Sequence, residues 1–168
     1  ACVIERGYTL AKDAGYNAMV TMQSWMFLSS FEKMRERMLR EKTITKMVQI
    51  GYNSFPSMNS KIAQATAFSL ANHRAGNFVG AFIDLNSAPQ SADKQAVFLA
   101  RDPANRFEIP VDEFKKLPCS PVAYWVSKTL RDVFFHSSSV SDVADPRQGL
   151  ATGRNDEFLR FWSEVDRA

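Results

Sequence analysis

An apolar run that ends in a polar corner, with a helix pattern directly after it, limits the possible folds of this chain most strongly. The run is Asn17 to Gln23, NAMVTMQ, in which apolar residues barely alternate with polar ones. A strand buried on both faces gives this pattern, and such strands are typical of α/β folds. Ser29-x-x-Glu32 has the spacing of a capping box, which predicts the start of a helix. The sequence therefore predicts a strand, a corner and a helix in succession.

The first half of the chain contains further elements of both kinds. Residues 3–12 have roughly helical spacing, and Gly15 suits a left-handed cap after them. Strands are predicted at 44–50, 62–71 and 78–85. The last two flank NHRAGN, a turn sequence that favours an antiparallel hairpin.

The second half is richer in turn residues. From Asn86 the periodicity weakens, and VDEFKKLP predicts a short helix that stops before Pro118. A longer helix is predicted from Pro121 to Phe135, because proline is favoured in a first turn and an apolar stripe follows. That stripe comprises Ala123, Val126, Leu130 and Val133. A Ser, Gly and Pro-containing loop then leads to a last short segment, DEFLRFWSEV.

Composition excludes several classes of protein. The net charge of +3 permits a polyanionic partner without arguing for one. Cys2 and Cys119 lie far apart, which indicates a reducing cytoplasm rather than a disulfide framework. With only two histidines, no metal site is expected. No apolar run approaches the ~20 residues that span a bilayer, so we expect a cytoplasmic protein with no membrane contact.

The residues alone contain no complete catalytic constellation. There is no P-loop, no GxGxxG after a strand, and no Ser/His/Asp set. A basic cluster is interleaved with glutamates, which favours a solvated helix face over a nucleic-acid track. The cluster comprises Lys33, Arg35, Arg37, Arg40, Lys42 and Lys46. Up to this point the sequence supports an α/β domain with a trailing segment.

Three segments resemble a known family in the order that the family has them. YTLAKDAGYNAMVTMQSWMFLSSFEKMRERMLREKTITKMVQIG resembles the stretch after the NPPY motif of adenine-N6 DNA methyltransferases. FPSMNSKIAQATAFSLAN is similar to the later loop and strand pair of that family. VADPRQGLATGRNDEFLRFW is similar to the entry into the target-recognition domain. The resemblance is strongest to the large methyltransferase of phage-exclusion (BREX) systems.

The resemblance implies a fold, a domain organisation and a reaction. The fold class is α/β: the last strands of a Rossmann-like class I methyltransferase sheet, with an antiparallel hairpin, followed by a helical and loop segment. Residues 1–86 would be the C-terminal half of the catalytic domain, 87–138 a helical connector, and 139–168 the start of the target-recognition region. The implied reaction transfers a methyl group from S-adenosylmethionine to adenine N6 in DNA.

The resemblance also suggests a substrate cleft after the first strand. In open α/β sheets ligands bind beyond the carboxyl ends of strands, so Gln23, Ser24 and Trp25 would face the cleft. The alternative is that Trp25 belongs to the core while Gln23 and Ser24 cap the next helix.

Phe55 matches the position of the family's stacking aromatic. These enzymes extrude adenine from the duplex, and an aromatic side chain opposite the NPPY tyrosine holds the base. The alternative is a loop phenylalanine packed on the core. The sequence departs from the family directly afterwards, because Asn59-Ser60-Lys61 stands where a glycine-rich acidic stretch is usual.

The third segment offers candidate DNA contacts. Arginine, glutamine and asparagine there alternate with Gly149 and Gly153, and glycines let a backbone approach phosphates closely. The candidates are Arg147, Gln148, Arg154 and Asn155. A polar interdomain linker is the alternative.

The family's catalytic motifs are absent from these 168 residues. Neither the glycine-containing loop for S-adenosylmethionine nor NPPY occurs. We therefore expect either a piece excised from a larger enzyme or the product of a split or degraded gene, which in both cases binds no cofactor and is inactive alone. Its partners would be DNA and the N-terminal part of the catalytic domain. An unpaired sheet edge would also favour self-association. The alternative function is a non-catalytic module that binds protein or nucleic acid in a defence complex.

Overall fold

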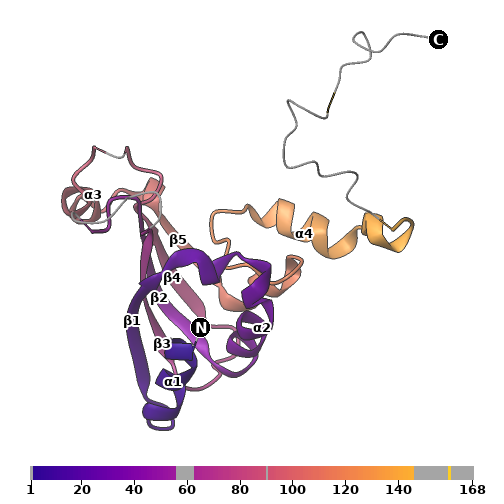
Figure 1. The fold of residues 1–168 in the computed structure, drawn as a ribbon, viewed down its shortest axis with the longest axis horizontal. Helices are drawn as coiled ribbons and strands as arrows, with labels where there is room; N and C mark the ends of the chain where they lie inside the picture. Colours follow the sequence, from indigo (N-terminus) through magenta and orange to yellow (C-terminus); the bar gives the residue numbers. More distant parts are fainter. Residues whose placement is uncertain (1, 56–62, 90, 146–158, 160–168) are drawn as a thin grey trace. The chain divides into compact units, whose positions relative to one another are not determined.

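The computed structural model describes residues 2–55, 63–89, 91–145 and 159 (Figure 1). The chain divides into two compact units, Ala1–His136 and Ser137–Ala168. In the second unit a single 3-10 turn, η5 (Val140–Asp142), is seen among the described residues. There the Asp142 carboxylate accepts the backbone N–H of Ser139 at 2.7 Å. The segment predicted at 156–165 lies outside the described ranges, Leu159 excepted.

Within the described ranges of the first unit, the strands form one mixed sheet. They are β1 (Tyr16–Met22), β2 (Thr43–Gly51), β3 (Ala65–Ala71), β4 (Val79–Asp84) and β5 (Arg106–Pro110), in the spatial order β1-β3-β2-β4-β5 (Figure 1). β3 is antiparallel to both β1 and β2, and β2 is parallel to β4. β1, β2 and β4 therefore point the same way. The segments predicted as strands share one sheet, and β5, which was not predicted, is added antiparallel to β4.

The predicted hairpin between 62–71 and 78–85 is wrong. β3 and β4 are not neighbours, because β2 lies between them. Most β3 residues are buried, as in a central strand with a partner on each side. The turn residues hold other elements instead. Asn72 Nδ2 donates to the carbonyls of Tyr8, Ala11 and Lys12. The chain between β3 and β4 then crosses β2, so that β4 pairs with β2 on the side opposite β3.

β1 is not the doubly buried strand that its composition predicts. Its residues alternate between exposed and half-buried, and 60% of the Val20 surface is exposed. Among the described residues β1 pairs only with β3. It is therefore an edge strand whose outer apolar side chains lack cover within the described part of the chain.

Two helices pack on one face of the sheet and form the core with it. They are α1 (Cys2–Leu10) and α2 (Glu32–Glu41). The predicted helix at 3–12 is thus confirmed, although the left-handed residue after it is Ala14 (φ 59°) rather than Gly15. The core includes Ile4, Trp25, Met26, Met34, Met38, Leu39, Ile44, Met47, Phe68, Leu70, Phe82, Phe114 and Tyr124.

The predicted capping box does not form. Two 3-10 turns, η1 (Gln23–Met26) and η2 (Ser29–Phe31), connect β1 to α2. Ser29 is inside the second turn, and Phe31 precedes the helix without a capping side-chain bond. The corner is instead held from within by Arg35, one turn into α2.

Arg35 is a buried structural residue rather than part of a solvated helix face. None of its surface is exposed, and its guanidinium donates to four backbone carbonyls. They belong to Trp25 (3.0 Å), Leu28 (2.6 Å), Cys119 (2.8 Å) and Ser120 (3.3 Å). Burial lowers the pKa of Arg35, and the nearby Cys119 and Glu32 oppose that shift. The residue ties the β1–α2 corner to the chain before α4.

The helix predicted from Pro121 begins only at Lys128, as α4 (Lys128–His136). Residues 122–124 are buried instead, and the Val122 N–H donates to the Met26 carbonyl at 3.0 Å. Core packing therefore overrides the helical spacing here. The short helix predicted before Pro118 exists as a 3-10 turn, η4 (Val111–Lys116). α3 (Lys94–Ala100) and the turn η3 (Pro103–Asn105) precede β5.

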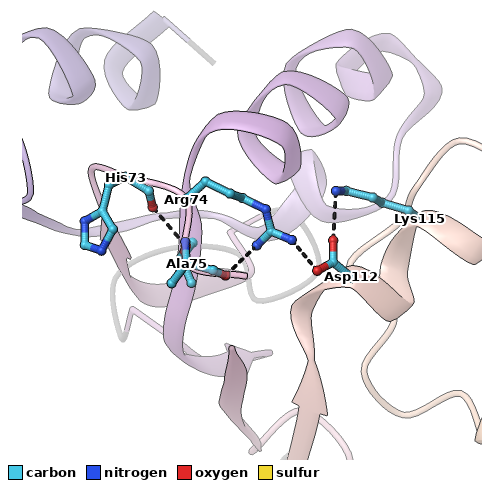
Figure 2. Close-up of polar contacts among 6 residues, drawn as sticks. His73, Arg74, Ala75, Asp112 and Lys115 are labelled. Carbon is cyan, nitrogen blue, oxygen red and sulfur yellow. Dashed lines mark hydrogen bonds and ion pairs between the residues drawn. The ribbon is translucent and has the colours of Figure 1, made fainter. Parts of the chain in front are cut away.

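A small charged cluster fixes η4 to the β3–β4 connection. Figure 2 shows the Arg74 guanidinium between the Ala75 carbonyl (3.0 Å) and the Asp112 carboxylate. Lys115 Nζ donates to the other Asp112 oxygen at 2.8 Å. These contacts lie beside Thr43, at the start of β2, whose hydroxyl donates to the His73 carbonyl and accepts the Ala75 N–H.

Candidate functional site

A pocket opens at the carboxyl ends of the parallel strands β1, β2 and β4. Its volume is about 360 Å³. Gln23 directly follows β1, Gln49 lies near the end of β2, and Asp84 ends β4. The pocket is lined by Gln23, Phe27, Gln49, Asp84, Asn86, Ser87 and Trp125. Parallel strands bring their carboxyl ends to the same sheet edge, which explains why polar residues far apart in sequence meet here.

A chain of side-chain hydrogen bonds orders the inner wall. Tyr124 donates its hydroxyl to Gln49 Oε1 at 2.5 Å, and Gln49 Nε2 donates to Gln23 Oε1 at 2.9 Å. Gln23 Nε2 in turn donates to Gln64 Oε1. Only 4% of Gln49 is exposed, so its amide is held without competition from bulk water. Burial, and then the negative charge of Asp84, raise the pKa of Tyr124, which keeps the hydroxyl a donor.

Asp84 places one negative charge at the pocket. Its Oδ1 accepts the backbone N–H groups of Asn86 (2.8 Å) and Ser87 (3.2 Å), which fixes the turn after β4. Lys94 donates to the Leu85 carbonyl nearby. Burial lowers the pKa of Lys94, and the Asp84 carboxylate partly opposes that shift.

Aromatic side chains form the outer wall. The rings of Phe27 and Trp125 meet edge to face with centroids 5.5 Å apart. Trp125 also meets Tyr124 edge to face at 5.0 Å. Tyr124 is buried, whereas 46% of the Trp125 surface is exposed. The pocket therefore combines a buried amide floor with an exposed aromatic rim.

A β-bulge at the end of β2 shapes the pocket side of that strand. The pairing of β2 with β3 shifts register between Gln49 and Gly51. Gly51 has φ +71°, and a Cβ built on it would lie 1.9 Å from Asn86 Oδ1. Glycine is needed for both reasons: the left-handed backbone and the close approach of the asparagine.

The three predicted cleft residues, Gln23, Ser24 and Trp25, lie in different environments in the structure. Gln23 lines the pocket, and Ser24 contributes its carbonyl to the turn by accepting the N–H of Phe27 and Leu28. Trp25 is only 2% exposed and packs edge to face on Phe68, while its indole N–H donates to Thr21. The prediction that the Trp25 side chain faces the cleft is therefore corrected: it belongs to the core.

Phe55 lies in the loop after β2, so it follows the same sheet edge as the pocket. It is 41% exposed, does not belong to the core cluster and does not line the pocket. The loop before it is held by Ser54, whose hydroxyl accepts the Ala65 N–H at 3.0 Å. The predicted DNA contacts Arg147, Gln148, Arg154 and Asn155 lie outside the described residues.

Sequence reasoning missed most of the pocket. Gln49 and Asp84 end strands that were predicted, so polar residues at strand ends were the available signal. Tyr124 and Trp125 were assigned to a helix that does not form there, and no local pattern shows that Tyr124 reaches Gln49, 75 positions earlier.

The pocket suits a neutral or amino-bearing planar ligand better than a metal or a phosphate. Amides and a carboxylate supply both acceptors and donors, and the aromatic rim supplies stacking. Within the described ranges, no group of three or more His, Cys, Asp and Glu is placed to hold a metal ion. The β1–α2 connection contains no glycine, so it lacks the close backbone approach of a nucleotide-phosphate loop. No described helix is long and apolar enough to cross a membrane.

Comparisons with known proteins agree with one another. The family model described as Eco57I restriction-modification methylase matches residues 1–55. The chain is 34% identical over 170 residues to the adenine-specific methyltransferase PglX of Lacticaseibacillus casei (strain Zhang), covering 98% of this chain and 14% of that protein. The adenine-specific methyltransferase BrxX of Escherichia coli O9:H4 (strain HS) is 34% identical over 167 residues, covering 98% of this chain and 13% of that protein.

A solved structure shares the fold. It is the type I restriction-modification system methyltransferase subunit from Streptococcus thermophilus, with a TM-score of 0.51 and 16% identity. The match covers 68% of this chain and 27% of that one. The chain thus spans a small part of the curated relatives it matches.

Proposed function

Because this chain is related to one segment of the adenine-specific methyltransferases PglX and BrxX, we propose that it is part of the catalytic domain of a DNA adenine-N6 methyltransferase. The system would be one of restriction-modification or phage defence. The observation that carries the proposal is 34% identity extending over 98% of the chain. The polar and aromatic pocket at the carboxyl ends of β1, β2 and β4 is consistent with a substrate-binding role.

The chain would supply the substrate side of the domain. S-adenosylmethionine, the methyl donor, would be held by residues outside this chain, since no described strand-to-helix turn offers a site for it. Phe55 would stack on the extruded adenine, for which its exposed position at the carboxyl edge is suitable. Gln23 would form part of the cleft wall, and Arg147, Gln148, Arg154 and Asn155 would contact DNA. On this proposal the 168 residues alone do not methylate DNA.

Methyl transfer by the full-length protein that carries this chain tests the proposal. The substrate is genomic DNA from a strain without adenine methylation, and the readout is N6-methyladenine formed per minute. Phe55→Ala should lower kcat/KM by roughly 5- to 150-fold, the loss expected for one base–aromatic stack. Phe55→Tyr should retain most activity because it keeps the ring.

The matched control is Phe135→Ala, another exposed phenylalanine, located on α4. Its activity should equal that of the unmodified protein. A full-length protein that forms no N6-methyladenine overturns the proposed reaction. Equal activities of Phe55→Ala and Phe135→Ala overturn the role of Phe55 alone.

A further inference from the structure

We propose that one face of α4 is the docking surface for the part of the full-length protein that follows residue 168. This apolar face consists of Leu130, Val133 and Phe134. The proposal rests on the proposed function only in treating the chain as one segment of a longer protein. It concerns how parts of that protein hold together and not the pocket at the carboxyl ends of the strands.

α4 turns its charged side chains toward the fold. Arg131 is only 4% exposed, and its Nε donates to Glu113 Oε2 at 3.3 Å while its Nη1 donates to the Val126 carbonyl. On the same side Lys116 Nζ donates to Asp132 Oδ1 at 2.7 Å. Glu113 and Lys116 both belong to η4. These contacts fix the rotation of α4 about its own axis.

The apolar side chains of α4 therefore point away from the fold. Leu130, Val133 and Phe134 share one face, because residues at i, i+3 and i+4 of a helix are neighbours. Their exposed fractions are 47%, 52% and 50%. Ion pairs on the other face already hold the helix, so packing within the first unit leaves about half of each apolar side chain uncovered. Clustered exposed apolar residues of this kind mark a contact with another surface.

Position and chain length favour the following part of the protein as the occupant. The first unit ends at His136, the last residue of α4, so later residues are tethered close to this face and lose less freedom on docking than a separate partner would. The curated relatives are about seven times longer than the matched segment, which includes α4. Residues that precede this chain would enter at α1, and Figure 1 shows α4 away from α1 and β1.

The chemistry of the face limits the kind of segment that fits. Its three residues carry neither a charge nor a hydrogen-bonding side chain. A complementary apolar stripe from a helix or strand would therefore cover it, because burying a charged group there would leave that group unpaired.

Hydroxyl-radical footprinting of the full-length protein tests whether the face is covered. Phe134 and Phe135 have similar exposed fractions, 50% and 61%, but Phe135 lies about 100° further around the helix and outside the apolar face. Tandem mass spectrometry separates oxidation of the two rings. Side chains at the centre of an interface are almost completely buried, so Phe134 should be oxidised at least about fivefold more slowly than Phe135. Similar oxidation rates of the two rings overturn the proposal.

Photo-crosslinking then identifies the occupant. The photoreactive amino acid p-benzoylphenylalanine, placed at position 134 of the full-length protein, should link to residues of the same chain that follow 168. Placed at position 135 as the matched control, it should link there in much lower yield. A link to a second copy, which doubles the mass on a denaturing gel, overturns the proposal. A link to residues that precede this chain, or no link at all, also overturns it.

These outcomes are independent of methyl transfer, because neither measurement contains DNA or a methyl donor. A failed cross-link therefore leaves the proposed function unaffected. Conversely, a full-length protein that forms no N6-methyladenine overturns the proposed reaction and leaves the docking surface to be judged by the footprint and the cross-link.

Discussion

Arg35 shows how a single buried cation can organise several irregular segments. Its guanidinium donates to carbonyls from η1, the following turn and the 119–120 segment, and none of its surface reaches solvent. A lysine ammonium has three donors on one atom and cannot span the same carbonyls. The basic pattern of α2 did not reveal this, because Arg35 has the same spacing as its exposed neighbours.

We expect Arg35→Ala to lower the free energy of unfolding by about 2–4 kcal/mol, because it leaves buried carbonyls without donors. Arg35→Lys should lose most of the same free energy. Lys33→Ala, at an exposed position of the same helix, should change it by less than about 0.5 kcal/mol. Urea unfolding measures all three. Similar midpoints for Arg35→Ala and Lys33→Ala would contradict the role of Arg35.

Asp112 makes a pH-dependent contribution to stability. The hydrogen bond from Lys115 lowers the pKa of Asp112 most; burial opposes this, and Arg74 adds to the lowering (Figure 2). A lowered folded pKa stabilises the fold above the unfolded pKa of about 3.9, and the benefit is lost as the pH falls through the folded pKa. Since 42% of the side chain is exposed, solvent screening limits the effect to about 1 kcal/mol or less.

Asp112→Asn should therefore reduce stability at pH 7 and converge with the unmodified chain as the pH drops below about 4. Denaturant unfolding at several pH values measures this difference. Lys33→Ala, at an exposed position, serves as the control substitution, and its unfolding free energy should stay within about 0.5 kcal/mol of that of the unmodified chain at each pH. A gap that widens at low pH would contradict the assignment.

At the scale of elements, the end of β2 is the point where backbone and side-chain constraints coincide. Gly51 has φ +71°, and Asn86 occupies the space of a Cβ. Gly51→Ala should cost about 2 kcal/mol or more, from the left-handed backbone and the clash together. In an Asn86→Gly background, which removes the Oδ1, Cγ and Cβ atoms that crowd the position, the clash disappears and the cost should fall toward about 1–2 kcal/mol for the backbone alone.

The control for this cycle is Gly76→Ala, because a Cβ there would meet nothing within 4 Å. Its unfolding free energy should stay close to that of the unmodified chain. Equal costs of Gly51→Ala in both backgrounds would show that Asn86 does not crowd this position.

Elements were predictable where local pattern decides them and not where a distant partner does. The spacing at 3–12 and the apolar runs at 44–50 and 62–71 gave α1, β2 and β3. The predicted pairing of β3 with β4 was wrong, because β3 pairs with β1 and β2, and β4 pairs in parallel with β2. These pairings depend on contacts between segments far apart in sequence, which no local pattern shows. Helical spacing after Pro121 failed for the same reason: Tyr124 bonds to Gln49 in the core.

The candidate site divides in the same way. Gln23 was found because a polar residue that ends an apolar run is visible in the sequence. Asp84 and Gln49 are also polar residues at the ends of apolar strands. Those two strands were used only to predict the sheet, and their last residues were not considered as part of a site. Trp125 also lines the pocket, but its position follows from the burial of residues 122–124, which the local sequence pattern does not predict.

At the scale of the whole molecule, one side of the sheet lacks cover within the described part of the chain. β1 pairs with β3 alone there, and an apolar groove of about 380 Å³ extends over β1, β3 and β2. Ala18, Val20 and Val48 are among its lining residues. The curated relatives are about seven times longer than the matched segment, which provides ample chain to cover this surface in such proteins.

The 168-residue chain, when isolated, should therefore self-associate through the β1 edge, since an unpaired strand with exposed apolar side chains is a template for pairing. Val20 is 60% exposed on that strand, and Val20→Lys should oppose association by placing a charge at the edge. Sedimentation velocity over a hundredfold range of concentration should show a rising average mass for the unmodified chain and a constant monomer mass for Val20→Lys. Val133→Lys, at a 52% exposed position on α4, is the matched control and should associate like the unmodified chain. A constant monomer mass for the unmodified chain at the highest concentration would show that this edge does not drive association.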